Sequence, residues 1–296
     1  MLWIFLLTGP VSGQPVYYPR LVAVITAEES PSGPLKQAGA VDVDADGNVY
    51  IVDRGNNRLL KFSGDRFVRE VGGFGNEGDQ FDDPRDVDAS LTLDILVADY
   101  NNERIVRFDR NLNFVTAYSG QSEEGELVFG RVKSVAYSNQ LEIFLIDDDQ
   151  RQVVKLDRLG NAPLFFGGPE EPYGQLLDPF QLTVSAQQVF VSDPGQGAVL
   201  VYDFLGNFIS RIQVTDFQPG ALDWAPDKEL LVLNQQNQHL LAFNRHYQLK
   251  YSLIFRELTS PIQDIAIWVA SGDNVKRVYV LTEHQCRIYE YTQTNK

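Results

Sequence analysis

Carboxylates are the side chains of this 296-residue chain that most readily suggest chemistry. Asp147, Asp148 and Asp149 follow one another in a predicted loop, and such oxygens are the ligands that hard divalent cations prefer. The aspartates from Asp42 to Asp53 have the spacing of a calcium loop, but their flanks alternate with a period of two, which predicts a hairpin instead. An acidic turn is the ordinary meaning of such a run. We therefore assign no metal ligand and leave a divalent cation open.

Histidine and cysteine are scarce in this sequence. His239, His246 and His284 are the three histidines, and Cys286 is the single cysteine. A catalytic zinc normally takes three protein ligands and a water, and these residues are too few and too scattered to supply them. Residues 73–78 match the pattern G-x-G-x-x-G, but an acidic loop follows instead of the helix that a dinucleotide needs. We predict no catalytic residue and no cofactor-binding residue.

A repeated phrase determines the elements that must position these side chains. VYIVDRGNNRLLKF at 49–62 returns as ILVADYNNERIVRF at 95–108, and weaker copies follow at intervals of 41 to 48 residues. Each copy divides into four short alternating segments separated by turn residues, which is typical of an antiparallel four-stranded meander. Six copies predict an all-β, six-bladed β-propeller. The slot that anchors each copy holds Asp53, Asp99, Asp147, Asp193, Asn234 and Thr282.

The ends of the chain suggest how the ring closes. The sixth copy has only three predicted strands, whereas a β-rich segment at residues 20–26 belongs to no copy. A ring of blades protects its edges best if this segment completes the last blade. We therefore predict that residues 21–25 pair with residues 288–291.

Taken together, these motifs resemble those of a known repeat family. The phrase F-x-x-P before a unit, the Gly-Asn hairpin, a strand ending in V-x-D, Asn-Asn, and then an arginine five residues after the aspartate together resemble the NHL repeat of six-bladed propellers. The resemblance implies structural roles for the repeat residues, with carboxylate–guanidinium pairs formed by Asp53 with Arg58 and by Asp99 with Arg104. Later copies depart from this pattern. The repeat positions are Asp53, Arg58, Asp99, Arg104, Asp147, Asp193 and Arg287.

Loops on a rigid scaffold are where binding residues concentrate, so the segments that follow each linker are the candidate ligand or partner rim. Arg85 and Lys133 lie on neighbouring predicted blades, and two cations in an acidic protein suggest a small anionic ligand or a carboxylate-bearing peptide. The candidate rim comprises Arg85, Asp86, Lys133, Ser134, Phe180, Gln181, Gln263, Asp264 and Tyr100.

Composition narrows the setting of the protein. Forty acidic residues against 25 basic ones give a net charge of -15, which disfavours nucleic acid and anionic membranes. Residues 1–13 resemble a secretory signal, with an apolar run, a Gly-Pro break and small residues, although no positive charge precedes the run. No other apolar stretch approaches the ~20 residues of a membrane span. We expect residues 14–296 to form one domain that is exported to the periplasm, cell envelope or extracellular space as a monomer.

Three functions fit these observations. The first is a non-catalytic binding or scaffold propeller with a protein or peptide partner on its loop face and no cofactor. The second is a metal-dependent enzyme of the lyase or lactonase kind with an axial site. The third is an RNA-binding NHL propeller, which the acidic charge disfavours. A fold hosts many functions, so the choice depends on the site.

Overall fold

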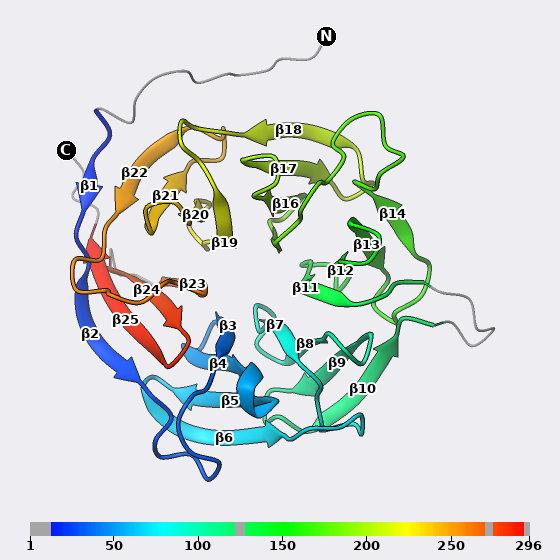
Figure 1. The fold of residues 1–296 in the computed structure, drawn as a ribbon, viewed down its shortest axis with the longest axis vertical. Coiled ribbons are helices and arrows are strands. Elements are labelled where there is room, and N and C mark those ends of the chain that lie inside the picture. Colours follow the sequence, from blue (N-terminus) through cyan, green and yellow to red (C-terminus); the bar gives the residue numbers. More distant parts are fainter. Residues whose placement is uncertain (1–12, 122–127, 270–274, 293–296) are drawn as a thin grey trace.

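The computed structural model describes residues 13–121, 128–269 and 275–292, and these form six antiparallel sheets arranged around a central axis (Figure 1). The predicted six-bladed propeller is therefore confirmed. The strands of the first three blades are β3 (Ala38–Val43), β4 (Asn48–Asp53), β5 (Arg58–Ser63) and β6 (Arg66–Gly72); β7 (Pro84–Asp88), β8 (Asp94–Asp99), β9 (Arg104–Asp109) and β10 (Phe114–Ser119); and β11 (Val132–Tyr137), β12 (Ile143–Asp147), β13 (Gln152–Leu156) and β14 (Leu164–Phe166).

The remaining blades repeat this order from the axis outward, except that the last blade takes its outer strand from the start of the chain. Their strands are β15 (Gln181–Val184), β16 (Gln188–Asp193), β17 (Ala198–Asp203) and β18 (Phe208–Ile212); β19 (Pro219–Trp224), β20 (Leu230–Asn234), β21 (His239–Phe243) and β22 (Leu249–Leu253); and β23 (Asp264–Val269), β24 (Val275–Thr282), β25 (Gln285–Thr292) and β2 (Arg20–Ile25). A short 3₁₀ helix covers Arg54–Asn56. No helix within the described ranges has the length and apolar character that a membrane crossing requires.

Alternation along each strand builds the core between blades. Successive side chains of a strand point to opposite faces of its sheet. In β4, Val49 and Ile51 accordingly pack toward the sixth blade, whereas Tyr50 and Val52 pack toward the second. Both faces of every blade are covered by a neighbour, so the middle strands are buried almost throughout.

The ring closes as predicted. Leu21 lies opposite Tyr289, and Ile25 lies opposite Cys286, in the antiparallel pairing of β2 with β25. A further strand was not predicted: β1 (Val16–Tyr17) runs parallel to β22 at the outer edge of the fifth blade. The ring of Tyr17 lies 5.3 Å from that of Tyr251, in an edge-on contact. The N-terminal segment thus binds the outer edges of two neighbouring blades.

The predicted pairs of repeat residues are present. Arg58 Nε donates to Asp53 at 2.8 Å, and Arg104 Nε donates to Asp99 at 2.7 Å. The other oxygen of each aspartate accepts a backbone N–H of the preceding linker, from Lys36 and Asp82. The pairs therefore fasten each linker to its blade.

The other repeat positions use different partners. Asp147 accepts from the amide of Gln152, which occupies the arginine slot, and Asp193 accepts from backbone N–H groups of Leu177 and Asp178. Arg287 donates to the backbone oxygen of Glu257 and to the side-chain oxygen of Gln285, and among the described residues it forms no carboxylate pair of the repeat kind. The motif thus keeps its linker-fastening role after losing its arginine.

Candidate functional site

The innermost strands of the six blades surround a central tunnel. Their register with the second strands places side chains of the six blades at equivalent heights, in two tiers two residues apart. The first tier consists of Ala40, Asp86, Ser134, Gln181, Ala221 and Asp264. The second tier consists of Asp42, Asp88, Ala136, Thr183, Asp223 and Ala266. Five of these twelve side chains are aspartates, so the tunnel is lined by carboxyl groups.

The polar tunnel side chains connect each blade to the next. Asp86 Oδ2 accepts the backbone N–H of Val135 at 2.9 Å, and Asp264 Oδ2 accepts that of Val41 at 2.8 Å. The same bond type recurs at every junction of the ring, and a blade that has alanine in one tier uses its other tier. The remaining bonds join Asp42 to Ala89, Asp88 to Tyr137, Ser134 to Leu182, Gln181 to Leu222 and Asp223 to Ile267.

Burial makes these carboxyl groups retain protons. Burial and then the neighbouring Asp88 and Asp223 raise the pKa of Asp42 well above its usual range. Burial raises the pKa of Asp86 to about 7 and that of Asp223 to about 6. The pKa of Asp264 is raised by burial and then by Asp86. The tunnel therefore carries less negative charge at neutral pH than five aspartates would suggest.

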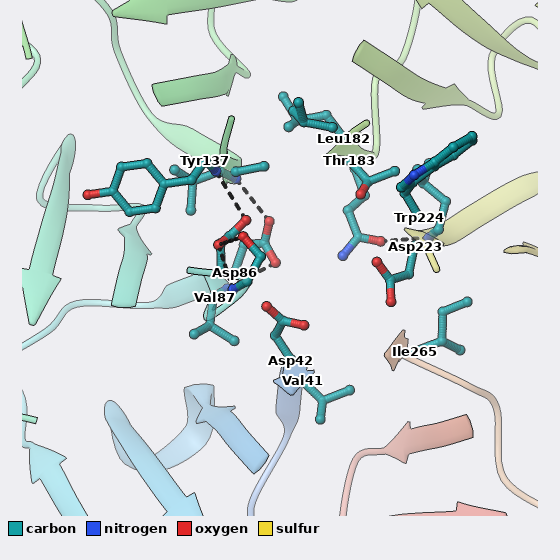
Figure 2. A pocket seen from close by; sticks show the side chains of 17 residues that line it. Val41, Asp42, Asp86, Val87, Tyr137, Leu182, Thr183, Asp223, Trp224 and Ile265 are labelled. Atoms are coloured by element: carbon teal, nitrogen blue, oxygen red, sulfur yellow. Dashed lines mark hydrogen bonds between the residues drawn. The ribbon is translucent and has the colours of Figure 1, made fainter. Parts of the chain in front are cut away.

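A cavity of about 80 Å³ lies within the tunnel at the second tier. Figure 2 shows the carboxyl groups of Asp42 and Asp223 pointing toward its centre, with Trp224 and Tyr137 farther out. Trp224 is fixed by stacking on Phe190, with ring centroids 5.1 Å apart. The space is large enough for ordered water, since about 10 to 15 Å³ of such space holds one molecule.

The structure separates the predicted rim residues into two groups. Asp86, Ser134, Gln181 and Asp264 point into the tunnel, where they form bonds between blades or across the axis. Arg85, Lys133 and Tyr100 lie instead near the end of the ring that carries the linkers between blades and the loops after each second strand, which we call the linker face. The opposite end, with the turns between first and second and between third and fourth strands, is the hairpin face. Phe180 donates its backbone N–H to Ser192 O of β16, and Gln263 donates its backbone N–H to Leu281 O of β24.

A network of charged and aromatic side chains covers the linker face at the second and third blades. The guanidinium of Arg85 lies 4.3 Å from the ring centroid of Tyr100, and that of Arg131 lies 5.2 Å from it. Asp83 accepts from Arg85 at 2.8 Å, while the hydroxyl of Tyr100 donates to Asp148 at 2.6 Å. Burial and then the bond to Asp148 raise the pKa of Tyr100 to about 12. We call Arg85, Tyr100, Arg131 and Lys133 the linker-face platform.

The two predicted cations are both paired with carboxylates. Arg85 contacts Asp83, and Lys133 contacts Asp148 at 3.1 Å and Asp178 at 3.8 Å. The charge available for an anionic ligand is therefore smaller than the sequence suggests. The same bonds fix the two side chains in place.

The other candidate chemical groups do not converge. Asp147 accepts from Gln152, Asp148 from Lys133, and Asp149 from Arg131, so the acidic run points to three different partners. In the ranges that the structure describes, no three His, Cys, Asp or Glu side chains are grouped so as to hold a metal ion. His246 and His284 are exposed, and Cys286 is buried in the last blade.

Known proteins resemble both the first blade and the whole ring. Residues 35–62, which contain β4 and most of the first blade's inner strands, match the NHL repeat. The match ends within β5, so it covers the three inner strands of the first blade. A search of curated proteins found no match to this chain.

Solved structures resemble the whole ring. A streptogramin B lyase is 12% identical, with a TM-score of 0.61, over 90% of this chain and 86% of that one. A catalytically inactive histidine-to-alanine variant of virginiamycin B lyase from Staphylococcus aureus, with quinupristin, is 10% identical, with a TM-score of 0.61, over 88% and 96%. A chain of a nidogen/laminin complex is 13% identical, with a TM-score of 0.63, over 79% and 85%. At these identities the likeness shows the fold alone.

Three tunnel aspartates were missed by the sequence reasoning. Asp42, Asp88 and Asp223 occupy equivalent second-tier positions on three blades. Asp88 lies two residues beyond the predicted Asp86, a spacing that returns to the same face of a strand. Asp42 and Asp223 would have been found by aligning the innermost strands of the first and fifth blades with that strand.

Proposed function

We propose that this NHL propeller is a non-catalytic binding protein that holds a protein partner on its linker face. The size of the axial cavity carries the proposal: about 80 Å³ is well below the roughly 300 to 1,000 Å³ of pockets that hold small-molecule substrates. The tunnel side chains are also engaged with backbone groups of neighbouring blades. Recognition is therefore assigned to the outside of the ring.

The linker-face platform has the composition of a protein-binding surface. Arginine is among the residues most enriched where interfaces derive their binding energy. Tyr100, which is buried at 8% exposure, holds the guanidinium groups of Arg85 and Arg131 in place, and side chains held before binding lose less entropy. Exposed apolar side chains in the neighbouring linkers add contact area, since Phe74 is 74% exposed and Tyr173 is 66% exposed. Because the platform cations already have carboxylate partners, we expect shape and aromatic contacts to contribute more than net charge.

The named relatives support this choice in different ways. One similar chain belongs to a nidogen/laminin complex, which is an assembly of proteins. The lyase that is inactive as a histidine-to-alanine variant depends on a histidine for its activity. The side chains that line the axial cavity of this NHL propeller include no histidine among the residues that the structure describes.

The proposal also covers the location, the oligomeric state and the ligands of the protein. The signal-like segment at residues 1–13 favours export, and its first 12 residues lie outside the described ranges. We propose that the exported propeller acts as a monomer, with no nucleic acid and no bound cofactor. The acidic net charge of -15 supports the exclusion of RNA.

Site-specific photo-crosslinking in the native source tests the proposed face. A photoreactive residue replaces Phe74 or Tyr173 on the linker face, and Leu205, which is 73% exposed in a hairpin-face turn, serves as the matched control. We expect the two linker-face positions to capture the same protein and Leu205 to capture none of it. The purified partner should then bind Tyr100→Ala at least tenfold more weakly than the unmodified chain. Capture from Leu205 alone would contradict the proposal.

Two measurements distinguish the other functions. Metal content of protein purified without chelator is expected to be far below one ion per chain, and a stoichiometric divalent cation that is lost in Asp42→Asn would favour the metal-dependent enzyme. Filter binding at low salt is expected to show no tight RNA complex, because the negative charge of the chain opposes phosphate.

A further inference from the structure

We propose that β10, the outer strand of the second blade, is a second binding site, where a partner polypeptide adds an extended segment as one more strand. This inference goes beyond the linker-face function because it concerns the outer wall of the ring (Figure 1). Within the described ranges, β10 ends its sheet and pairs only with β9. A strand in that position presents a row of backbone donors and acceptors to an incoming chain.

The chain itself shows that such an edge accepts an extended segment. At the fifth blade, Ser252 donates its backbone N–H to Pro15 O at 3.0 Å, and Ile254 donates to Tyr17 O at 3.1 Å. The side chain of Tyr17 packs against the rings of Tyr251 and Tyr291. Two backbone bonds and the packing of the Tyr17 ring on two neighbouring rings therefore hold β1, which is tethered to β2, on the outer edge of a blade.

Among the open edges, β10 is the one least protected. Proteins usually guard an edge strand with charge, with proline or by keeping it short. The six residues of β10, FVTAYS, include no charged side chain and no proline, and its register irregularity at Val115 is shared with β6 and β18, so it does not set β10 apart. The other outer strands are guarded: β6 by Arg66, Arg69 and Glu70, β18 by Arg211, β14 by its three-residue length, and β2 by Arg20 at its start and by its role in closing the ring.

Exposed apolar side chains from two blades flank this edge. Phe114 and Val115 are each 46% exposed at the start of β10. Leu159, which is 65% exposed, lies in a turn of the third blade that packs on the same strand, because Tyr118 Oη donates to Arg158 O at 3.4 Å. Gly160 of that turn leaves no room for a Cβ beside the ring of Tyr118. The edge therefore offers both backbone groups and apolar contacts.

These features define the occupant. Main-chain bonds to an edge strand give affinity, and contacts with alternate side chains give specificity. The segment is an extended stretch of a partner protein with apolar side chains at every second position. Basic residues at its ends complement a propeller with a net charge of -15.

A displayed library of random peptides, about twelve residues long, tests the site on the full chain. Peptides enriched on the unmodified protein are synthesised, and their dissociation constants are measured by fluorescence anisotropy. We expect alternating apolar sequences whose binding weakens at least tenfold in Val115→Lys and in Leu159→Lys. Two further peptides are methylated, one on the odd-numbered and one on the even-numbered backbone nitrogens. One of them should bind at least tenfold more weakly and the other nearly as well as the parent peptide, because only alternate N–H groups face the edge.

Matched variants at other edges locate the binding. Val68→Lys on β6 and Val24→Lys on β2 replace side chains that are 51% and 41% exposed, and each should change the dissociation constant less than twofold. All four positions are at least 41% exposed, so each variant should keep the thermal melting temperature of the parent. The proposal is overturned if no peptide is enriched, if binding survives Val115→Lys and Leu159→Lys, if it is lost in Val24→Lys instead, or if both methylated peptides bind as well as the parent peptide.

Discussion

Gln181 of the fourth blade donates its side-chain amide to Asp264 of the sixth blade at 3.0 Å. Ala221 occupies the equivalent first-tier position of the fifth blade between them and leaves the space for this bond. The amide oxygen of Gln181 meanwhile accepts the backbone N–H of Leu222 at 2.9 Å. One side chain thus joins three blades across the axis.

Replacing this glutamine should loosen the tunnel. Gln181→Met keeps the length of the side chain but leaves the N–H of Leu222 and an oxygen of Asp264 without their partner. An unsatisfied buried group costs about 1 to 3 kcal/mol, so we expect the free energy of unfolding in urea to fall by that amount. Gln187→Met in an exposed turn is the control and should change it by less than about 0.5 kcal/mol. Equal effects of the two variants would show that the bridge adds nothing to stability.

The tunnel carboxyls should make the protein less stable as the pH rises. The folded pKa of Asp86 is about 7 and that of Asp223 is about 6, both above the usual 3.8 of an aspartate, so the folded state holds protons that the unfolded state releases. Stability from these groups is complete below about pH 4 and is lost as the pH rises through 6 and 7, by up to about 1.4 kcal/mol per pH unit for each group. Asp86→Asn, which cannot ionise, should reduce this slope, measured by urea unfolding between pH 4.5 and 8.

Glu229 affects stability at a lower pH than the tunnel carboxyls do. Although burial opposes it, hydrogen bonds from Lys250, Lys276 and Tyr251 lower the pKa of Glu229 to about 2. Its contribution is therefore present above about pH 4 and is lost only in stronger acid.

Asp65→Asn, in an exposed turn of the first blade, is the control for Asp86→Asn and should leave the slope of stability between pH 4.5 and 8 unchanged. A parent protein whose stability rises with pH in that window would contradict the assignment of raised pKa values to the tunnel.

The sequence predicted what depends on local repetition and not what depends on distant contacts. The blade count, the Asp53–Arg58 and Asp99–Arg104 pairs and the pairing of β2 with β25 follow from spacing, because each unit folds on itself and the last one lacks a strand. Strand β1 has two residues, and its place beside β22 depends on segments more than 200 residues apart. The partners of Lys133 and Arg85 were missed for another reason. Asp148 lies in the same blade as Lys133 and Asp83 lies two residues before Arg85, but neither carboxylate occupies a position that the repeats share.

The third repeat shows where pattern reading fails within one unit. Arg151 stands one position before the arginine slot, and Gln152 occupies the slot and donates to Asp147 at 3.3 Å. Arg151 takes the left-handed conformation, with φ at 51°, in the turn position that Asn57 fills in the first blade. The turn therefore fixes which residue faces the aspartate, and the charge of the neighbouring residue does not change it.

The arginines of the repeat should differ in their effect on stability. Arg58 is 3% exposed and bonds to Asp53, Glu70 and a linker carbonyl, so Arg58→Ala leaves a buried carboxylate without its partner. We expect a loss of about 3 to 5 kcal/mol in the free energy of unfolding. Arg287→Ala removes a half-buried side chain that donates to the backbone oxygen of Glu257 at 3.0 Å and to the side-chain oxygen of Gln285 at 3.2 Å, and it should cost about 1 kcal/mol. Urea titration of both variants checks the order, and a larger loss for Arg287→Ala would contradict it.

Cys286 should report the closure of the ring. Its thiol is fully buried opposite Ile25 in the pairing of β2 with β25, and burial raises its pKa, so a thiol reagent should react with it only when this pairing opens. Removing residues 1–19 deletes β1 alone and should leave the labelling rate by Ellman's reagent within a few fold of that of the full chain. Removing residues 1–25 also deletes β2, and labelling should then become at least a hundredfold faster. Far-UV circular dichroism of both truncated chains checks that the remaining sheets have formed. An unreactive thiol in a folded chain without β2 would show that the sixth blade is held by its neighbours and not by the strand that closes the ring.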